Sequence, residues 1–198
     1  MKTLIAIALT PLFMLLGAQQ PEVAPAAVDI KESTVTWKGY KVTGSHGGTI
    51  DIKDGELIYG DDGSLSGGAV TIDMTTITCT DLKEGGANKL VGHLKSDDFF
   101  GVANHPEAKL VITNVAAKGT PGDYKVTADL TIKETTKPIK FYASVAERDG
   151  EKVATADIKI DRTDFDVRYG SGSFFDNLGD KTIYDEFDIT VQILSAAQ

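Results

Sequence analysis

Apolar and polar residues alternate with a period of two along most of the chain, and this pattern predicts β-strands. Successive side chains of a strand point to opposite faces, so each such run has one apolar face and one polar face. In the run 124–133, for example, Val126, Leu130 and Ile132 alternate with charged residues and threonines. Strands of this kind cover a core on one side and meet water on the other.

About eight of these runs follow one another, joined by turn sequences such as Asp149-Gly150. A helical stretch interrupts them around residues 88–100, where Leu90, Val91 and Leu94 have helical spacing, and it could cover one end of a barrel. The sequence contains no internal repeat, which argues against a propeller or a solenoid. We therefore predict an all-β, eight-stranded antiparallel barrel with one short helical excursion. The predicted strands cover residues 33–37, 49–58, 68–78, 108–115, 124–133, 138–145, 154–160 and 183–193.

Several residues on the predicted inward face are small, namely Ala128, Ala143, Ala154 and Ala156. Small inward residues either let strands curl tightly or leave room for a ligand, and the sequence leaves both explanations open.

The beginning of the chain has a different pattern. A positive start at Met1-Lys2, an apolar run from Leu4 to Leu16 and a small-residue exit predict a secretory signal peptide over residues 1–18. The run is too short to span a bilayer. Residues 19–27, rich in proline and small side chains, are predicted to form a flexible leader. Signal-peptide cleavage is predicted after Ala18, and cleavage after Ala26 is the alternative.

The chain is acidic: the whole sequence has a net charge of −9. This charge argues against nucleic acid and anionic membrane surfaces as partners. No later apolar run is long enough to cross a bilayer, so we predict no stable membrane insertion. Cys79 is the only cysteine, which excludes an internal disulfide. Its neighbours Thr78 and Thr80 predict a strand position and a buried, inert thiol.

Motifs that carry chemistry are missing from the sequence. The histidines, His46, His93 and His105, lie in separate segments without the spacing of a zinc site. The segment Gly170-Ser171-Gly172-Ser173 lacks the spacing of a nucleophile elbow, and there is no phosphate-binding loop or calcium loop. We therefore predict no catalytic residue, no metal site and no cofactor.

Arg162 is the single charged residue that stands out. The parity of Ile158 and Ile160 directs its side chain inward, near one end of the barrel, where a guanidinium must be paired or meet a polar ligand group. It either contacts a ligand head group or pairs with Asp161, Asp164 or a distant carboxylate. We favour the structural role, because a single buried charge is more often structural than ligand-contacting.

Four features in order along the chain resemble one protein family. They are the opening strand to Trp37 with His46, the stretch His93–Phe100 followed by Pro106, Leu130–Lys133 followed by Thr136–Pro138, and Ile160–Arg162 followed by Phe165. Behind a signal peptide, this combination resembles the YceI-like family, over a domain of residues 28–195. One departure is Asp166, which stands where a glycine is usual.

The resemblance implies a lipocalin-like barrel in the periplasm of a bacterial cell, which holds a polyisoprenoid or a quinone-like lipid and needs no catalytic group. A homodimer is compatible with it. An apolar channel can bind such a chain through burial of surface alone. The candidate ligand-binding residues are Val35, Trp37, Ile50, Ile52, Val70, Ile72, Leu110, Ile112, Leu130, Ile132, Phe141, Ile158, Ile160, Arg162 and Phe187.

Two alternatives remain at this point. An enzyme acting on a small apolar substrate requires His46 or His93 to meet Arg162 in the cavity. An envelope or stress protein without a ligand predicts a filled interior, with no cavity beyond a few water-sized voids.

Overall fold

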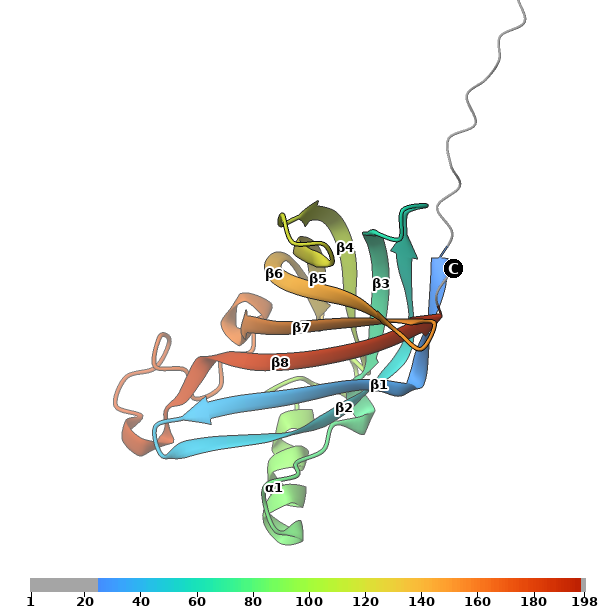
Figure 1. The fold of residues 1–198 in the computed structure, drawn as a ribbon. Coiled ribbons are helices and arrows are strands. Elements are labelled where there is room, and N and C mark those ends of the chain that lie inside the picture. The colour runs from blue at the N-terminus through green and yellow to red at the C-terminus, as the bar shows by residue number, and fades with distance from the viewer. Residues whose placement is uncertain (1–24, 197–198) are drawn as a thin grey trace, which may run out of the picture.

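The computed structural model describes residues 25–196 of the chain, and the predicted signal peptide lies outside them. Eight antiparallel strands pair in sequence order, and β1 also pairs with β8, so the sheet closes into a barrel (Figure 1). The predicted all-β, eight-stranded barrel is therefore confirmed. The strands are β1 (Pro25–Lys41), β2 (Gly44–Tyr59), β3 (Leu65–Asp73), β4 (Glu107–Ala117), β5 (Asp123–Ile132), β6 (Thr135–Arg148), β7 (Glu151–Asp161) and β8 (Ile183–Ala196).

The period-two pattern has the structural meaning that the sequence predicts. Along β5, the side chains of Tyr124, Val126, Ala128, Leu130 and Ile132 are all buried, and the residues between them are more exposed. The turn at Asp149-Gly150 joins β6 to β7 with positive φ at both positions, as a tight hairpin requires. Most strand ends lie further out than predicted, and β1 begins at Pro25, within the predicted leader 19–27.

The strand predicted over residues 68–78 ends earlier, at Asp73. The Asp73 carboxylate accepts hydrogen bonds from the backbone N–H and the hydroxyl of Thr75, which starts a short 3₁₀ helix, η1 (Met74–Thr76). This capping competes with the strand and turns the chain away from the sheet. Cys79 consequently lies after η1 rather than in a strand, so its predicted strand position is wrong. It is also only partly buried, whereas the sequence predicts a buried thiol.

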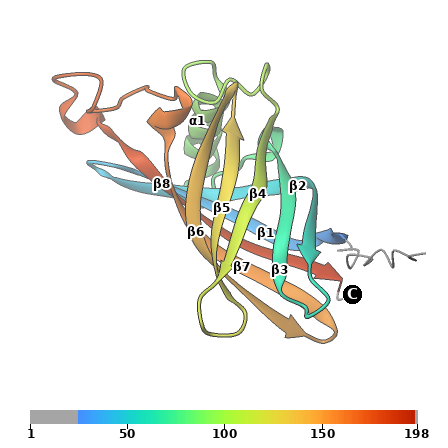
Figure 2. The ribbon, with the colours of Figure 1, turned by 90° about the horizontal axis from the view of Figure 1, so that it is seen from above.

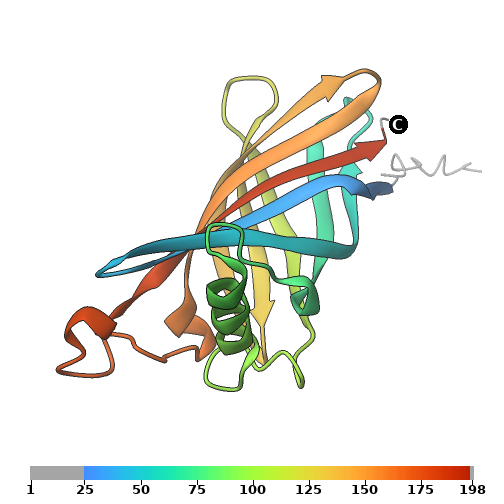
Figure 3. The ribbon, with the colours of Figure 1, turned by 90° about the horizontal axis from the view of Figure 1, so that it is seen from below.

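The helical excursion predicted around residues 88–100 is α1 (Glu84–Lys95), followed by a turn that carries Phe99 and Phe100. The helix starts earlier than predicted. Gly85 and Gly86 are poor helix formers, yet they lie in its first turn, where the N–H groups of Gly86 and Ala87 bond to the carbonyl of Lys83. Figure 2 and Figure 3 show α1 at the side of the barrel away from the C-terminal end of the chain.

After β7 the chain forms η2 (Arg162–Phe165), a loop with a second short 3₁₀ helix, η3 (Gly179–Lys181), and then β8. Asp166 caps η2 in the left-handed conformation, with φ of 60°. Aspartate tolerates this conformation better than most residues, which explains how it stands where a glycine is usual. Within residues 25–196, none of the helices has the length and apolarity needed to cross a membrane.

Candidate functional site

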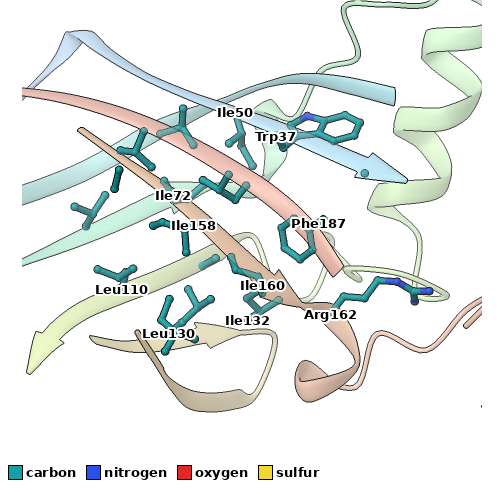
Figure 4. A pocket seen from close by; sticks show the side chains of 18 of the residues that line it. Trp37, Ile50, Ile72, Leu110, Leu130, Ile132, Ile158, Ile160, Arg162 and Phe187 are labelled. Atoms are coloured by element: carbon teal, nitrogen blue, oxygen red, sulfur yellow. The ribbon is translucent and has the colours of Figure 1, made fainter. Parts of the chain in front are cut away.

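The interior of the barrel contains a cavity of about 280 Å³. Inward side chains from all eight strands line it, together with residues of α1, η1 and the turn after α1. Figure 4 shows aliphatic and aromatic side chains from several strands converging on this space, with Arg162 at the edge of the group and its guanidinium pointing away from them. The wall is almost entirely apolar, so the cavity suits a hydrocarbon rather than a polar metabolite.

The predicted ligand-binding residues lie around this cavity, with one exception. Ile52 is buried in the core, with 4% of its surface exposed, and does not line the cavity. Contact of the others with a ligand stays a prediction. Those that line the cavity are Val35, Trp37, Ile50, Val70, Ile72, Leu110, Ile112, Leu130, Ile132, Phe141, Ile158, Ile160, Arg162 and Phe187.

Many of these inward side chains are only partly buried. Trp37, Leu110, Phe141 and Phe187 pack against the buried core, yet each keeps part of its surface accessible. In a filled barrel, inward apolar side chains would bury nearly all of their surface against one another. The small inward residues serve both purposes that the sequence left open. Ala156 lines the cavity and leaves room for a ligand, whereas Ala128 is fully buried outside the lining, where a small residue lets the strand curl tightly.

Two buried tyrosines, Tyr59 and Tyr124, lie next to Leu65, which lines the cavity. The Tyr59 hydroxyl lies 3.1 Å from the hydroxyl of Ser195, and both residues are almost fully buried. The Tyr124 hydroxyl accepts a hydrogen bond of 3.2 Å from the backbone N–H of Leu65. Burial raises the pKa of Tyr59, so this phenol stays neutral at ordinary pH. Because these contacts cross between distant strands, they hold the wall of the cavity in place beside Leu65.

One end of the cavity is covered by α1 and the turn that follows it. Leu90 and Leu94 face the cavity from one side of the helix, and Phe99 and Phe100 reach it from the turn, with their rings 5.0 Å apart. These residues are not among the predicted ligand-binding residues, although Leu90 and Leu94 have helical spacing in the sequence. Which helix face meets the interior depends on how α1 docks, and periodicity alone does not specify that.

Arg162 lines the cavity near one end of the barrel, as predicted, although its guanidinium points away from the other lining side chains (Figure 4). Of the expected partners, a distant carboxylate is present, that of Asp185, and backbone carbonyls that the sequence does not suggest join it. The Arg162 side chain is 2% exposed, and its guanidinium donates hydrogen bonds to three backbone carbonyls and to this carboxylate. The acceptors are the carbonyls of Val167 at 2.6 Å, Ile183 at 3.0 Å and Tyr184 at 3.1 Å, and the carboxylate of Asp185 at 3.4 Å. Asp161, one of the expected partners, instead accepts hydrogen bonds from Thr163.

This arrangement makes Arg162 a structural tie between η2, the loop after it and the start of β8. Burial lowers the pKa of the guanidinium, and the charges of Asp185 and Asp161 oppose that shift. The guanidinium also lies over the ring of Phe99, 5.4 Å from its centroid, which links the tie to the covered end of the cavity.

Two histidines line the cavity in addition to Arg162. His46 belongs to β2, and its Nδ1 lies 3.3 Å from a carboxylate oxygen of Asp81. His93 belongs to α1 and packs against aromatic rings. Within residues 25–196, no three histidine, cysteine, aspartate or glutamate side chains are grouped so that they could hold a metal ion.

Asp81 also accepts a hydrogen bond from the Cys79 thiol at 3.1 Å. Desolvation and this hydrogen bond raise the thiol pKa, which disfavours a reactive thiolate.

The comparisons with known proteins agree with this architecture. The model of the YceI-like domain family matches residues 27–194. A UPF0312 protein of Shewanella denitrificans is 38% identical over 90 residues, which cover 46% of this chain and 44% of that protein. A UPF0312 protein of Photorhabdus laumondii is 45% identical over 53 residues, 27% of each chain. The matched segments therefore span less than half of these relatives.

Solved structures share the fold at low sequence identity. BcnA of Burkholderia cenocepacia superposes with a TM-score of 0.69 and 20% identity, covering 84% of this chain and 98% of its own. A polyisoprenoid binding domain from Saccharophagus degradans, implicated in plant cell wall breakdown, superposes with a TM-score of 0.65 and 13% identity. That match covers 89% of this chain and 100% of the other domain.

Proposed function

This chain belongs to the YceI-like family, and on that premise we propose that it is an exported, non-catalytic carrier that holds a polyisoprenoid or similar long apolar molecule inside its barrel. The observation that carries the proposal is the apolar cavity of about 280 Å³, which many inward side chains line while keeping part of their surface exposed. The ligand class is further supported by the structural likeness to a polyisoprenoid binding domain.

Burial of surface alone supplies the energy that such binding needs. A lipid chain that loses about 400 Å² of apolar surface gains about 10 kcal/mol, which offsets the lower estimates of the cost of association. A long chain fits an elongated site. The lining extends along β8 from Ile183 to Ile193, a distance of about 33 Å at the usual rise of a strand. Strand tilt reduces the length along the barrel axis to about 25 Å.

Export rests on the sequence pattern of residues 1–18, which predicts a cleaved signal peptide and a periplasmic location. A carrier confined to that compartment would reach lipids of the cell envelope without inserting into a membrane. The homodimer stays a prediction.

Neither alternative is favoured by the site. The cavity is larger than the water-sized voids that a filled barrel predicts. An enzyme would need the guanidinium of Arg162 for its substrate, but this group is buried and already donates to Val167, Ile183 and Tyr184. Of the two histidines that could accompany it, His46 is engaged with Asp81, and His93 packs against the rings of Phe99 and Tyr169.

The proposal is tested by purifying the protein from its native envelope, extracting it with organic solvent and identifying bound lipid by mass spectrometry. A stoichiometric isoprenoid or quinone is expected. The matched variants are Ala156→Phe, which places a ring in the cavity, and Ala146→Phe, which places the same ring on the exposed outer face of β6. We expect Ala156→Phe to lose the lipid and Ala146→Phe to keep it. Equal lipid content in both variants, or a lipid-free wild-type protein that also refuses added isoprenoids, would refute the proposal.

A further inference from the structure

Large apolar side chains that face water are concentrated at one end of the molecule. In the described part of the chain seven such side chains are exposed, and five of them lie on the turn between β1 and β2, on the loop between η2 and β8, or at the start of β8. Figure 1 and Figure 3 show this turn and this loop at the same end of the molecule. The N–H of Val42 donates to the carbonyl of Thr182 at 3.2 Å, which ties the turn to the loop. We call the five side chains the apolar rim: Val42, Tyr169, Phe174, Phe175 and Tyr184.

The two phenylalanines of the rim are held outward by a built turn. Ser171 is fully buried, and its carbonyl accepts the N–H groups of Phe175 at 3.0 Å and Phe174 at 3.3 Å. The Ser173 hydroxyl donates to the carboxylate of Asp185 in β8 at 2.6 Å, which attaches the turn to the barrel. Phe174 nevertheless keeps 46% of its surface exposed and Phe175 keeps 51%. Clustered exposure of this kind marks an interaction site, because water contact with apolar rings is unfavourable.

The apolar rim borders the cavity of the barrel. Lys41 both lines the cavity and is exposed, which places an edge of the cavity at the surface, directly before Val42. Across the strands, Lys41 pairs with Ile183 of β8, another lining residue. On the side of α1, the ring of Tyr169 lies 4.5 Å from the ring of His93, which also lines the cavity. An apolar molecule that enters or leaves beside Lys41 therefore passes the rim.

The charges around the rim favour a surface without net charge. In residues 41–44 and 166–182, three basic and three acidic side chains cancel one another: Lys41, Arg168, Lys181, Asp166, Asp176 and Asp180. Arg168 pairs with Asp166 at 3.1 Å, and its guanidinium lies 4.6 Å from the centroid of the Phe174 ring. The whole chain has a net charge of −9, which repels an anionic surface. Attraction must therefore come from burial of the rings rather than from charge.

We propose that the apolar rim docks the protein reversibly on the surface of a zwitterionic phospholipid membrane. Phe174 and Phe175 enter the boundary between the head groups and the acyl chains, where burial of apolar side chains drives binding. The edge of the cavity beside Lys41 then faces the lipid, and a carried chain passes between membrane and barrel without exposing its whole surface to water. The purpose of the docking rests on the proposed function, because it names the surface from which the carrier takes its cargo.

Vesicle flotation measures docking with the mature full-length protein and no added cargo. The vesicles are pure phosphatidylcholine, or phosphatidylcholine mixed with anionic phosphatidylglycerol. The test variant carries Phe174→Ser and Phe175→Ser. The matched control carries Val111→Ser and Tyr142→Ser, which remove the two exposed large apolar side chains outside the rim, on β4 and β6. Circular dichroism checks the fold of both variants.

Wild-type protein and the control are expected to float with phosphatidylcholine vesicles. The rim variant should bind these vesicles at least about tenfold more weakly, because two phenyl rings no longer contribute buried surface. Phosphatidylglycerol should weaken the binding of the wild-type protein, since the chain is acidic. Added salt should change the binding to pure phosphatidylcholine little.

A second measurement separates docking from cargo binding. Geranylgeraniol is added from ethanol without vesicles, and its entry is followed by the fluorescence of Trp37, the only tryptophan, which lines the cavity. The rim variant should bind it as the wild-type protein does, because neither Phe174 nor Phe175 lines the cavity. Wild-type protein that floats with vesicles but refuses geranylgeraniol would contradict the proposed function, while the docking surface would stand.

Other results would overturn the docking and leave the proposed function in place. One is a wild-type protein that binds geranylgeraniol but no phosphatidylcholine vesicle, and another is equal vesicle binding in the rim variant and the control. Binding that requires phosphatidylglycerol and disappears with salt would assign the contact to basic side chains such as Lys181. A wild-type dimer in light scattering that the rim variant loses, without vesicle binding, would show that a second copy of the chain covers the rim.

Discussion

Replacing Arg162 by methionine tests whether this residue is a structural tie. The substitution keeps a long side chain of similar shape but removes every donor of the guanidinium. The backbone carbonyls of Val167, Ile183 and Tyr184 then lose their partner. These carbonyls belong to the loop after η2 and the first residues of β8, so we expect that region to loosen first.

The magnitude follows from the contacts. Hydrogen bonds from a charged donor contribute about 1.5 kcal/mol each at the lower end of their range, so the three carbonyl bonds together contribute about 4.5 kcal/mol. Methionine avoids the cost of burying a charge, which returns about 1 to 2 kcal/mol. The free energy of unfolding should therefore fall by about 3 kcal/mol. A domain of this size has about 5 to 15 kcal/mol of stability, so the variant should still fold.

Urea unfolding followed by circular dichroism measures this change. The matched control is Arg168→Met, because the side chain of Arg168 is about half exposed and pairs with Asp166 at the surface. The control should change stability by less than about 0.5 kcal/mol. A change below about 1 kcal/mol in Arg162→Met, together with a large loss of lipid affinity, would contradict the structural role and assign the guanidinium to the ligand.

Three further substitutions test the packing of the fold. Asp188→Asn weakens the hydrogen bond from Tyr40, which is the main cause of the lowered pKa of Asp188. The stability advantage of the wild-type protein over this variant should be present above about pH 4 and disappear as the pH falls through the lowered pKa of Asp188. A pH series of urea titrations that shows a growing advantage in acid would contradict this. Gly48→Ala would place a methyl carbon against the carbonyl oxygen of Thr78, so it should lower the melting temperature and cost at least about 2 kcal/mol. A neutral effect would mean that the segment after η1 is free to move. Asp166→Ala should cost about 1 kcal/mol in chemical denaturation because φ is positive, whereas Asp166→Gly should not; equal costs would assign the effect to the lost carboxylate instead.

The sequence by itself determined the strands and their inward faces. Alternation along β5 correctly separated buried Leu130 from the residues beside it, because a strand repeats every two residues whatever packs against it. Parity also placed Arg162 among the residues that line the cavity. In the same way, the apolar spacing around Leu90 predicted a helix, although the helix begins earlier than predicted, in a first turn that contains two glycines.

Only the tertiary structure decided what these inward faces enclose. The partners of Arg162 are backbone carbonyls from a loop and from β8, which no pattern of side chains reveals. The end of β3 depends on a hydrogen bond between Asp73 and Thr75 that competes with sheet pairing. Ile52 and Ile50 share one face of β2, but only Ile50 reaches the cavity. Periodicity specifies the direction of a side chain relative to its own strand, whereas a cavity depends on distances between elements, and those are fixed when the barrel closes and α1 docks.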